Sequence, residues 1–318
     1  MTDLVTFGET MLRLSPPDQE RLETADQYDV HVAGAESNVA VAAQRLGLDA
    51  AWLSKLPDSP VGRRVTGELR RHDVAIEVCW DDEDGRQGTY YLEQGDVPRG
   101  NEVIYDRADA SVTTLRTEEV PEGLVEDAGA VHTSGITPAL SETLEATTAD
   151  LLSRANDAGT TTCFDMNYRS KLWSPSEAKA VVTELFPDID VLVVAHRDAE
   201  QVLERAGDAT EVAASLTDDY DFDVTVVTRG AEGVVAATAD EQFAQDPFEA
   251  SDAHPVGSGD SFVGGFLSQY LTNGSVADGL EWGAATAALK RSVPGDIAVV
   301  SPGEIRELIQ GETAEISR

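Results

Sequence analysis

The amino-acid sequence predicts an α/β protein with a central, mostly parallel sheet flanked by helices. Short apolar runs alternate along the chain with segments of helical periodicity, which is the pattern of strand–helix–strand units. Several of these runs are largely apolar, as in strands buried on both faces of a parallel sheet. The 318 residues are 41% hydrophobic, enough for one large core. Because no linker-like stretch or internal repeat divides them, we expect a single domain over residues 1–318.

The strands and several helix ends can be read directly from the sequence. Ser174-Pro175-Ser176-Glu177 indicates a helix start, with a capping Ser, Pro at the first helical position and Glu at the third, and Ser301-Pro302-Gly303-Glu304 repeats the pattern. Gly47 and Gly159 stand where helix C-caps are expected. The expected strands are Leu4–Phe7, Ala51–Ser54, Ala130–Thr133, Thr161–Asp165, Val191–Val194 and Val224–Thr228. Ligands of such a fold bind beyond the carboxyl ends of the strands.

Two segments, 10–33 and 87–112, interrupt this alternation with charged residues, Gly and alternating polar and apolar positions. Within the second, Gly88–Glu93 and Glu102–Tyr105 predict an antiparallel pair of strands. We expect the two segments to form a small β-lid over the main domain. A surface hairpin without a functional role is the alternative.

The charge balance is strongly acidic, with 59 Asp and Glu against 23 Lys and Arg and a formal net charge of −36. The acids are spread along the whole chain, and only four of the basic residues are lysines: Lys55, Lys171, Lys179 and Lys290. Such a surface repels nucleic acids and anionic lipids, so neither is an expected partner. The composition resembles that of salt-adapted, halophilic cytoplasmic proteins, whose self-repulsion is screened at molar salt, where the Debye length is about 3 Å.

A cytoplasmic location is expected from three further features. No apolar run approaches the roughly 18 residues that a membrane span needs. The start of the chain, Met1–Leu4, lacks the basic and apolar regions of a signal peptide. The two cysteines, Cys79 and Cys163, lie in apolar surroundings and are expected to be buried thiols in a reducing compartment.

The segment Pro255-Val256-Gly257-Ser258-Gly259-Asp260-Ser261-Phe262 carries the strongest functional signal. It is a Gly-rich loop that opens an amphipathic helix, so the unpaired first amides of the helix can bind an anion. We expect an anion hole at Gly257, Ser258 and Gly259. Asp260 would be the catalytic base that takes a proton from an attacking hydroxyl while the amides hold a phosphoryl group. The alternative is an ordinary acid that stabilises a helix N-terminus.

This loop resembles the second signature of the ribokinase-like, PfkB-type sugar kinases, in which a Gly-x-Gly-Asp loop carries the catalytic Asp. The first signature is similar to Ala33–Ala40, which the resemblance places at the sugar site through Gly34 and Asn38. The likeness spans nearly the whole chain, from Phe7-Gly8-Glu9 to Val293-Pro294-Gly295-Asp296. It implies a ribokinase-like fold, dependence on ATP and Mg²⁺, and a homo-oligomer formed through the lid.

Within this family the chain looks most similar to 2-keto-3-deoxygluconate kinases, through Tyr105–Ala108, His132–Ser141, Phe164–Arg169 and Lys171–Trp173. The resemblance implies ATP-dependent phosphorylation of the terminal hydroxyl of that sugar acid, or of its galactonate-derived epimer. The substrate-binding residues would be Gly34, Asn38, Tyr90, Tyr105, Arg107, Ile136 and Arg169.

Physical chemistry agrees with a sugar acid, because a carboxylate needs a cation and Arg offers a bidentate fork. Arg107 and Arg169 could instead form salt bridges with the many acids of the chain. A fructokinase or another neutral-sugar kinase is the alternative enzyme. A non-catalytic sugar or nucleotide sensor is the alternative outside enzymes, although such a protein has no need for Asp260.

The turn Thr228–Gly233 resembles the nucleotide side of the family's active site. The resemblance places Thr228, Arg229, Gly230 and Gly233 at ATP, together with Gly257 and Gly259 of the anion-binding loop. A plain connection between two strands would use the same glycines.

The chain departs from the family pattern at two places. His254 stands where many relatives have an Asp that helps to build a monovalent-cation site, so such a site is not expected here. Ala195-His196-Arg197-Asp198 replaces a common Asn-x-x-Glu segment that is tied to Mg²⁺ and phosphate. Asp198 is therefore the candidate metal ligand, in partial replacement of the Glu.

Overall fold

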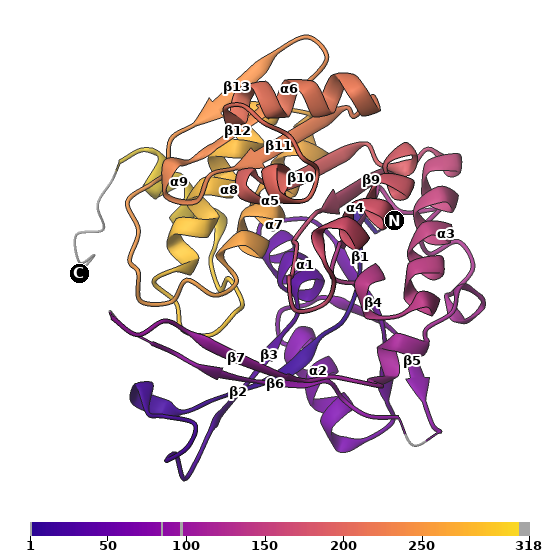
Figure 1. The fold of residues 1–318 in the computed structure, drawn as a ribbon, viewed down its shortest axis with the longest axis vertical. Helices are drawn as coiled ribbons and strands as arrows, with labels where there is room; N and C mark the ends of the chain where they lie inside the picture. The colour runs from indigo at the N-terminus through magenta and orange to yellow at the C-terminus, as the bar shows by residue number, and fades with distance from the viewer. Residues whose placement is uncertain (1, 84, 96–97, 312–318) are drawn as a thin grey trace.

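The computed structural model describes residues 2–83, 85–95 and 98–311, and these contain a large and a small β-sheet (Figure 1). The large sheet has the strand order β13-β12-β11-β10-β9-β8-β1-β4-β5. Its strands are β1 (Leu4–Phe7), β4 (Ala50–Pro57), β5 (Ala75–Asp81), β8 (Ala130–Ser134), β9 (Thr161–Asp165), β10 (Val191–Ala195), β11 (Val224–Thr228), β12 (Val234–Ala237) and β13 (Gln242–Gln245).

The large sheet is parallel from β5 to β11, and only β12 and β13 add to it in antiparallel fashion. All six strands expected from the sequence form, and each lies in this parallel part. The central strands are buried along nearly all of their length, as expected for strands covered on both faces of a parallel sheet. The prediction of a mostly parallel sheet is thus confirmed. The strands β5, β12 and β13 were not foreseen.

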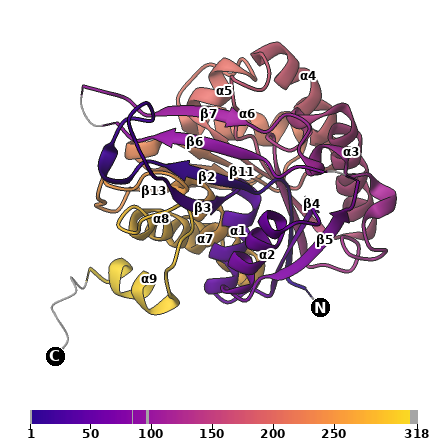
Figure 2. The same ribbon diagram turned by 90° about the horizontal axis from the view of Figure 1, so that it is seen from below.

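Helices cover both faces of the large sheet (Figures 1 and 2). The helices α3 to α6 pack on one face, and α1, α2, α7 and α8 pack on the other. Their bounds are α1 (Ala35–Arg45), α2 (Pro60–Arg70), α3 (Glu142–Ala158), α4 (Pro175–Leu185), α5 (His196–Gln201), α6 (Ala209–Tyr220), α7 (Ser258–Asn273), α8 (Val276–Lys290) and α9 (Pro302–Ile309). Single 3-10 turns lie at Pro17–Gln19, Ser111–Thr114, Thr117–Glu119, Pro138–Leu140, Phe186–Asp188 and Gly230–Glu232.

The helix ends follow the local signals in the sequence. Ser174 caps α4 by accepting a hydrogen bond from the amide of Glu177, whose carboxylate in turn accepts from the Ser174 amide. Ser301 caps α9 in the same reciprocal way. Gly159 ends α3 with φ of 80°, a left-handed conformation that favours glycine. These predictions are confirmed because each depends only on neighbours within one turn.

The small sheet has the order β3-β2-β6-β7, with β3 (Asp29–Ala33), β2 (Met11–Ser15), β6 (Thr89–Glu93) and β7 (Glu102–Asp106). Its strands come from the two segments that interrupt the strand–helix alternation. The expected antiparallel pairing of β6 and β7 is confirmed. The small sheet runs along one side of the larger layered body (Figure 1).

Two minor expectations can also be compared with the structure. Both cysteines are free thiols, and Cys163 is buried as expected, but Cys79 is only half-buried because it lies on the edge strand β5. No helix in the described ranges has the length and apolar character needed to cross a membrane.

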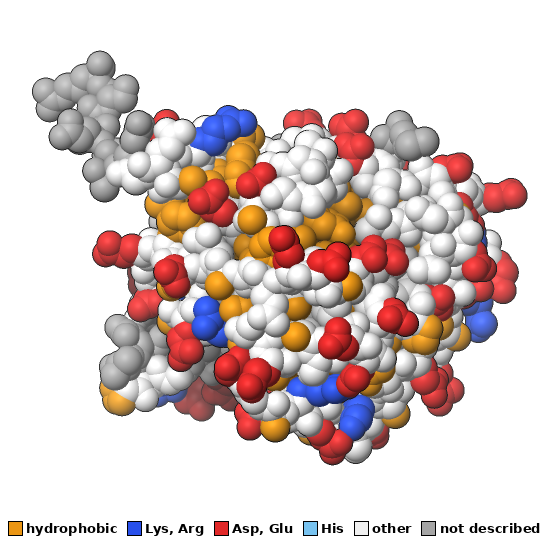
Figure 3. Space-filling view, turned by 90° about the horizontal axis from the view of Figure 1, so that it is seen from above, with side chains coloured by type: hydrophobic (Ala, Val, Ile, Leu, Met, Phe, Trp, Pro, Cys, Tyr) orange, Lys and Arg blue, Asp and Glu red, His pale blue; other side chains and the backbone are white. Residues whose placement is uncertain are grey.

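Acidic side chains dominate the charged surface, and Figure 3 shows them scattered over one face with few basic groups among them. Most of the ion pairs involve at least one exposed partner, such as Arg63 with Asp58 and Arg205 with Asp219. Exposed pairs of this kind contribute about 0 to 1 kcal/mol each, which does not offset the self-repulsion of a net charge of −36.

We therefore predict that the fold needs salt. In a melting series from dilute buffer to molar KCl, the melting temperature should rise steeply as the repulsion between carboxylates is screened. Sucrose at matched osmotic strength is the control, because it does not screen charge. A melting temperature that stays flat across the KCl series would contradict the interpretation of the acidic surface as salt adaptation.

Candidate active site

A cavity of about 790 Å³ lies between the small sheet and the carboxyl ends of the parallel strands. Its walls include Tyr90 and Tyr105 of the small sheet, Asp165 at the end of β9 and Thr228 at the end of β11. A second cavity, of about 420 Å³, adjoins it and shares Thr228, Gly259 and Phe262 with it. The start of α7 thus lies where the two cavities meet.

Nearly all candidate residues from the sequence line these two cavities. The larger cavity is lined by Gly34, Asn38, Tyr90, Tyr105, Arg107, Ile136, Arg169, Asp198, Thr228, Gly257, Gly259 and Asp260. The smaller cavity is lined by Thr228, Gly230, Gly233, Ser258 and Gly259. Arg229 lines neither of them, so the expectation that it approaches ATP finds no support in its position.

Gly257 shapes the start of α7. Its φ is 80°, and a Cβ atom at this position would lie 2.0 Å from the carbonyl oxygen of Asp296. Both the left-handed backbone and the close approach of the second loop therefore require glycine. The helix begins directly after this turn, and the first helical hydrogen bond joins the Ser261 amide to the Gly257 carbonyl at 2.9 Å.

The free amides at this helix start differ in part from those expected. The Ser258 amide donates to the carbonyl oxygen of Pro255 at 3.3 Å, and the Ser258 hydroxyl donates to the same oxygen at 2.8 Å. The amides of Gly257, Gly259 and Asp260 have no acceptor within the described part of the chain. An anion at this site would thus find three free donors, with Asp260 contributing one in place of Ser258.

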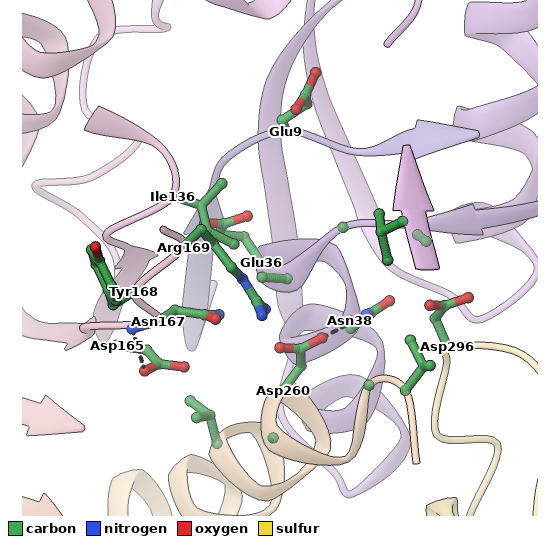
Figure 4. A pocket seen from close by; sticks show the side chains of 18 of the residues that line it. Glu9, Glu36, Asn38, Ile136, Asp165, Asn167, Tyr168, Arg169, Asp260 and Asp296 are labelled. Atoms are coloured by element: carbon green, nitrogen blue, oxygen red, sulfur yellow. Dashed lines mark hydrogen bonds between the residues drawn. The ribbon is translucent and has the colours of Figure 1, made fainter. Parts of the chain in front are cut away.

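Asp260 lies at the floor of the larger cavity with its carboxylate close to Asn38 (Figure 4). Burial raises the pKa of Asp260 to about 6, although the hydrogen bond from Asn38 and the charge of Arg169 act in the opposite direction. The side-chain amide nitrogen of Asn38 donates to Oδ2 of Asp260 at 2.7 Å. Asp260 is therefore ionised at neutral pH and basic enough to accept a proton.

Two further acids of the cavity hold their protons more tightly than ordinary carboxyls. Burial raises the pKa of Glu36 to about 7, and its Oε1 accepts hydrogen bonds from Ser134 at 2.6 Å and Thr137 at 3.0 Å. Burial, with a contribution from the charge of Asp260, raises the pKa of Asp165 to about 7. The start of α1 and the end of β9 thus add polar groups to the wall of the cavity without adding full negative charges.

Asp296 connects the small sheet to the loop that packs on Gly257. Its Oδ2 lies 2.8 Å from Nη1 of Arg13, and the side chains of both residues are at most 3% exposed. The hydroxyl of Tyr90 donates to Oδ1 of Asp296 at 3.3 Å. Arg13 belongs to β2 and Tyr90 to β6, so two strands of the small sheet are held against the helix start.

The two candidate arginines differ in their surroundings. Arg107 forms a buried ion pair with Glu9 and lies 5.3 Å from the centre of the Tyr105 ring. Its Nε is buried and has no hydrogen-bond acceptor among the described residues. The guanidinium of Arg169 makes no ion pair or hydrogen bond with the described part of the chain, and Figure 4 shows it pointing toward Asp260. Arg169 therefore offers the cavity a less compensated positive charge than Arg107 does.

The profile of the pfkB family carbohydrate kinases matches residues 1–302. The chain belongs to this family. It is 58% identical over 316 residues to a 2-dehydro-3-deoxygalactonokinase from Haloferax volcanii, and the match covers 99% of each chain.

Two crystal structures are similar to the chain over nearly its whole length. The 2-dehydro-3-deoxygluconokinase from Thermotoga maritima superposes with a TM-score of 0.92 and 33% identity, over 98% of this chain and all of that one. A putative ribokinase II from E. coli in complex with ATP and Mg²⁺ has a TM-score of 0.89 at 18% identity, over 98% of this chain and 100% of that one. These comparisons confirm the ribokinase-like fold and membership of the sugar kinases.

Several polar residues of this carbohydrate kinase's cavity were not predicted from the sequence. They are Glu9, Glu36, Asp165, Asn167 and Asp296. Three of them carry a signal that could have been used. Asp165 ends an expected strand and Glu9 follows another by two residues, so acids at the carboxyl edge of the sheet marked the cavity. Asp296 closes a Pro-Gly-Asp turn within the family-like segment Val293–Asp296.

The altered segment Ala195–Asp198, at the end of β10 and the start of α5, leaves one buried acid at the cavity. The side chain of Asp198 is 5% exposed, and its Oδ1 lies 2.9 Å from both Nε and Nη2 of Arg197. Within the described residues, no three or more His, Cys, Asp or Glu side chains converge as a metal cluster would require. Asp198 is thus a single carboxylate, already paired with a cation that is mostly exposed to solvent.

The raised pKa of Asp165 generates a stability prediction. The folded state binds a proton at Asp165 more tightly than the unfolded state, so this residue's contribution to stability falls as pH rises from about 4 to about 7. At pH 8 the folded protein has to bury the charge. We predict that Asp165→Asn raises the melting temperature at pH 8 by roughly 2 °C or more, and by less at pH 5. Asp240→Asn is the control, because it removes an equal charge from an exposed site. Equal effects of the two substitutions at both pH values would refute the prediction.

Proposed function

We propose that this pfkB family kinase transfers the γ-phosphoryl group of ATP to the terminal hydroxyl of 2-keto-3-deoxygluconate or its galactonate-derived epimer, in the cytoplasm. The observation that carries the proposal is the position of Asp260, which lies at the free amides of α7 where the two cavities meet. Arg169, in the larger cavity, supplies a cation for the carboxylate of a sugar acid. Two of the relatives named above, the kinases from Haloferax volcanii and Thermotoga maritima, carry the names of sugar-acid kinases of this class, which supports the same assignment.

The geometry favours one arrangement of the two substrates. The smaller cavity, lined by the turn from Gly230 to Gly233 and by the end of α8, suits the nucleotide. The larger cavity suits the sugar acid, and Gly259 belongs to both. The γ-phosphate of ATP would then lie at the start of α7, with the terminal hydroxyl of the sugar acid beside Asp260.

In the reaction, Asp260 takes the proton of this hydroxyl as the oxygen attacks the γ-phosphorus. The new O–P bond forms while the bond from the γ-phosphorus to the β,γ-bridging oxygen breaks, and ADP leaves with the electron pair. The amides of Gly257, Gly259 and Asp260 stabilise the charge on the transferring group, because they point at it without needing to reorganise. Asn38 keeps the carboxylate of Asp260 oriented toward the cavity.

Magnesium would neutralise the phosphates of bound ATP. Mg²⁺ usually keeps several waters and takes one or two carboxylates together with substrate phosphates. A single buried acid, Asp198, fits this requirement better than a dedicated protein cage would. We therefore assign Asp198 as the one protein group that reaches the ion, through water or directly.

We further propose that the small sheet acts as a lid over the sugar acid and takes part in a homo-oligomer. Tyr90, Tyr105 and Arg107 of this region line the cavity, so its position controls access to the substrate. The side of the sheet away from the cavity exposes apolar groups, with Val30 37% and Ile104 48% exposed. Pairing of two such sheets would cover these side chains and protect the strand edges.

The competing functions have less support. A neutral-sugar kinase would have no use for the charge of Arg169, which forms no ion pair with the described residues that line the larger cavity. A non-catalytic sensor would have no use for a carboxylate whose pKa burial raises to about 6 beside an anion site. One assay of ATP consumption with 2-keto-3-deoxygluconate, its galactonate-derived epimer and fructose, at molar salt, tests the proposal against both.

Asp260→Asn should fold and bind both substrates but lose most of its turnover. Loss of a general base costs typically 10²- to 10⁴-fold in kcat. Asp278→Asn is the matched control, because Asp278 is an exposed acid in the first turn of α8. If Asp260 were only a helix N-terminal acid, the two variants would behave alike, and near-wild-type turnover in Asp260→Asn would remove it from the mechanism.

The arginines should determine preference for the sugar acid. Wild type should favour 2-keto-3-deoxygluconate over fructose by at least roughly 100-fold in kcat/KM, since a charge-assisted hydrogen bond contributes about 1.5 to 3 kcal/mol. Arg169→Leu should remove most of this preference while any fructose activity is retained. Arg107→Leu should do so as well, and Arg107→Lys should recover only part of it.

Two controls make this comparison sharp. Glu9→Gln combined with Arg107→Leu avoids leaving Glu9 as a buried, unpaired charge. Arg86→Leu removes an arginine that pairs with Asp106 outside the cavity, so it should leave specificity unchanged. The protein would instead be assigned as a neutral-sugar kinase if wild type preferred fructose. The same would follow if the arginine variants lowered kcat/KM equally for both substrates.

A further inference from the structure

Lys290, the last residue of α8, is fully buried, although lysine is rare in this chain and usually exposed. Its ammonium donates to the backbone oxygens of Gly295 at 2.7 Å, His254 at 3.1 Å and Val293 at 3.4 Å. No carboxylate of the described residues lies within ion-pair distance of it. The charge is thus held by backbone carbonyls alone, in the manner in which proteins coordinate a monovalent metal cation.

Burying this charged group has an energetic cost, so its position calls for an explanation. Burial lowers the pKa of Lys290 to about 8, so the side chain is still mostly protonated at neutral pH but has lost much of its hydration. An apolar residue of similar size would avoid that cost in an ordinary core. Here it would instead leave the carbonyls of His254 and Gly295 turned toward a site without a donor.

The carbonyls that hold the ammonium belong to the two loops that form the start of α7. His254 lies three residues before Gly257, and Gly295 directly precedes Asp296. These loops touch closely, since a Cβ atom on Gly257 would lie 2.0 Å from the Asp296 carbonyl oxygen. Lys290 therefore ties the loop that presents the free amides to the loop that carries Asp296, from the side that faces α8.

We propose that the Lys290 ammonium acts as a built-in monovalent cation that holds the anion-binding loop in its active shape. Lys290 is a positioning residue, and its charge also adds to the positive potential behind the transferring phosphoryl group. His254 contributes its backbone oxygen to this site, and the position that an external ion would take is filled by the lysine itself. The inference rests on the proposed role of the amides at the start of α7.

The test compares wild type with Lys290→Ala and Lys290→Met at one fixed, molar ionic strength. The salts are NaCl, KCl, methylammonium chloride and choline chloride. Wild type should show the same kcat in NaCl and KCl within about twofold, because its cation is covalently attached. Lys290→Ala should lose at least roughly 10-fold in kcat in choline chloride, with a smaller change in the KM for ATP. It should recover in methylammonium chloride or KCl, whose ions fit the vacated space.

Lys290→Met is the matched control, because its side chain fills the same space without a charge and leaves no room for an ion. It should lose kcat in every salt and recover in none. A lysine that served packing alone would give the opposite order, with Met tolerated, Ala impaired and neither responding to the identity of the cation.

Melting temperatures in the same salts separate this inference from the proposed function. Lys290→Ala should melt higher in methylammonium or potassium chloride than in choline chloride, whether or not the protein phosphorylates a sugar acid. Strong potassium-specific activation of wild type would overturn the inference. So would a folded Lys290→Ala that keeps full activity or that no small cation restores. Failure of both variants to fold in all four salts would show a role in folding itself and would also overturn it.

Discussion

Asp260 has to remain a carboxylate at the floor of the larger cavity, and many polar contacts around it serve that requirement. Burial favours the protonated form, whereas the hydrogen bond from Asn38 and the charges of Arg169 and Lys290 favour the ionised form. The neighbouring acids Glu36 and Asp165 hold protons more readily than usual, which limits the negative charge gathered in one place. The Asp260 carboxylate can then lie next to an anion-binding helix start, because groups from distant parts of the chain stabilise its ionised form.

The same balance explains the organisation of the cavity walls. Asp296 would add another negative charge next to the helix start, but Arg13 of the small sheet pairs with it within a buried contact. Glu9 is compensated by Arg107 in a similar way. Each of these pairs joins the small sheet, or the segment that follows it, to the main body. Movement of the small sheet would thus change the charge environment of the site as well as its access to solvent.

The sequence alone predicted the features that depend on neighbours along the chain. The caps at Ser174 and Ser301, the turn at Gly159 and the loop before Asp260 all follow from a few adjacent residues. Pairings between distant residues could not be predicted in this way. Arg107 and Glu9 are 98 residues apart, and Lys290 and His254 are 36 apart, so each partner is chosen by the tertiary fold. The turn at Arg229 is a second example. The residues of a turn predict where along the chain the turn lies, but they do not determine which cavity the side chain of Arg229 approaches.

The acidic surface has a consequence for how substrates arrive. A nucleoside triphosphate and a sugar acid are both anions, and each must cross the field of a protein whose formal charge is −36. Many enzymes attract charged ligands over long distances, and their association rates fall as salt rises. Here the long-range field opposes encounter, and the attraction of the arginines that line the cavity begins only within its mouth. Salt would thus raise the rate at which the substrates associate with the protein, and rapid association would occur only at high salt concentration.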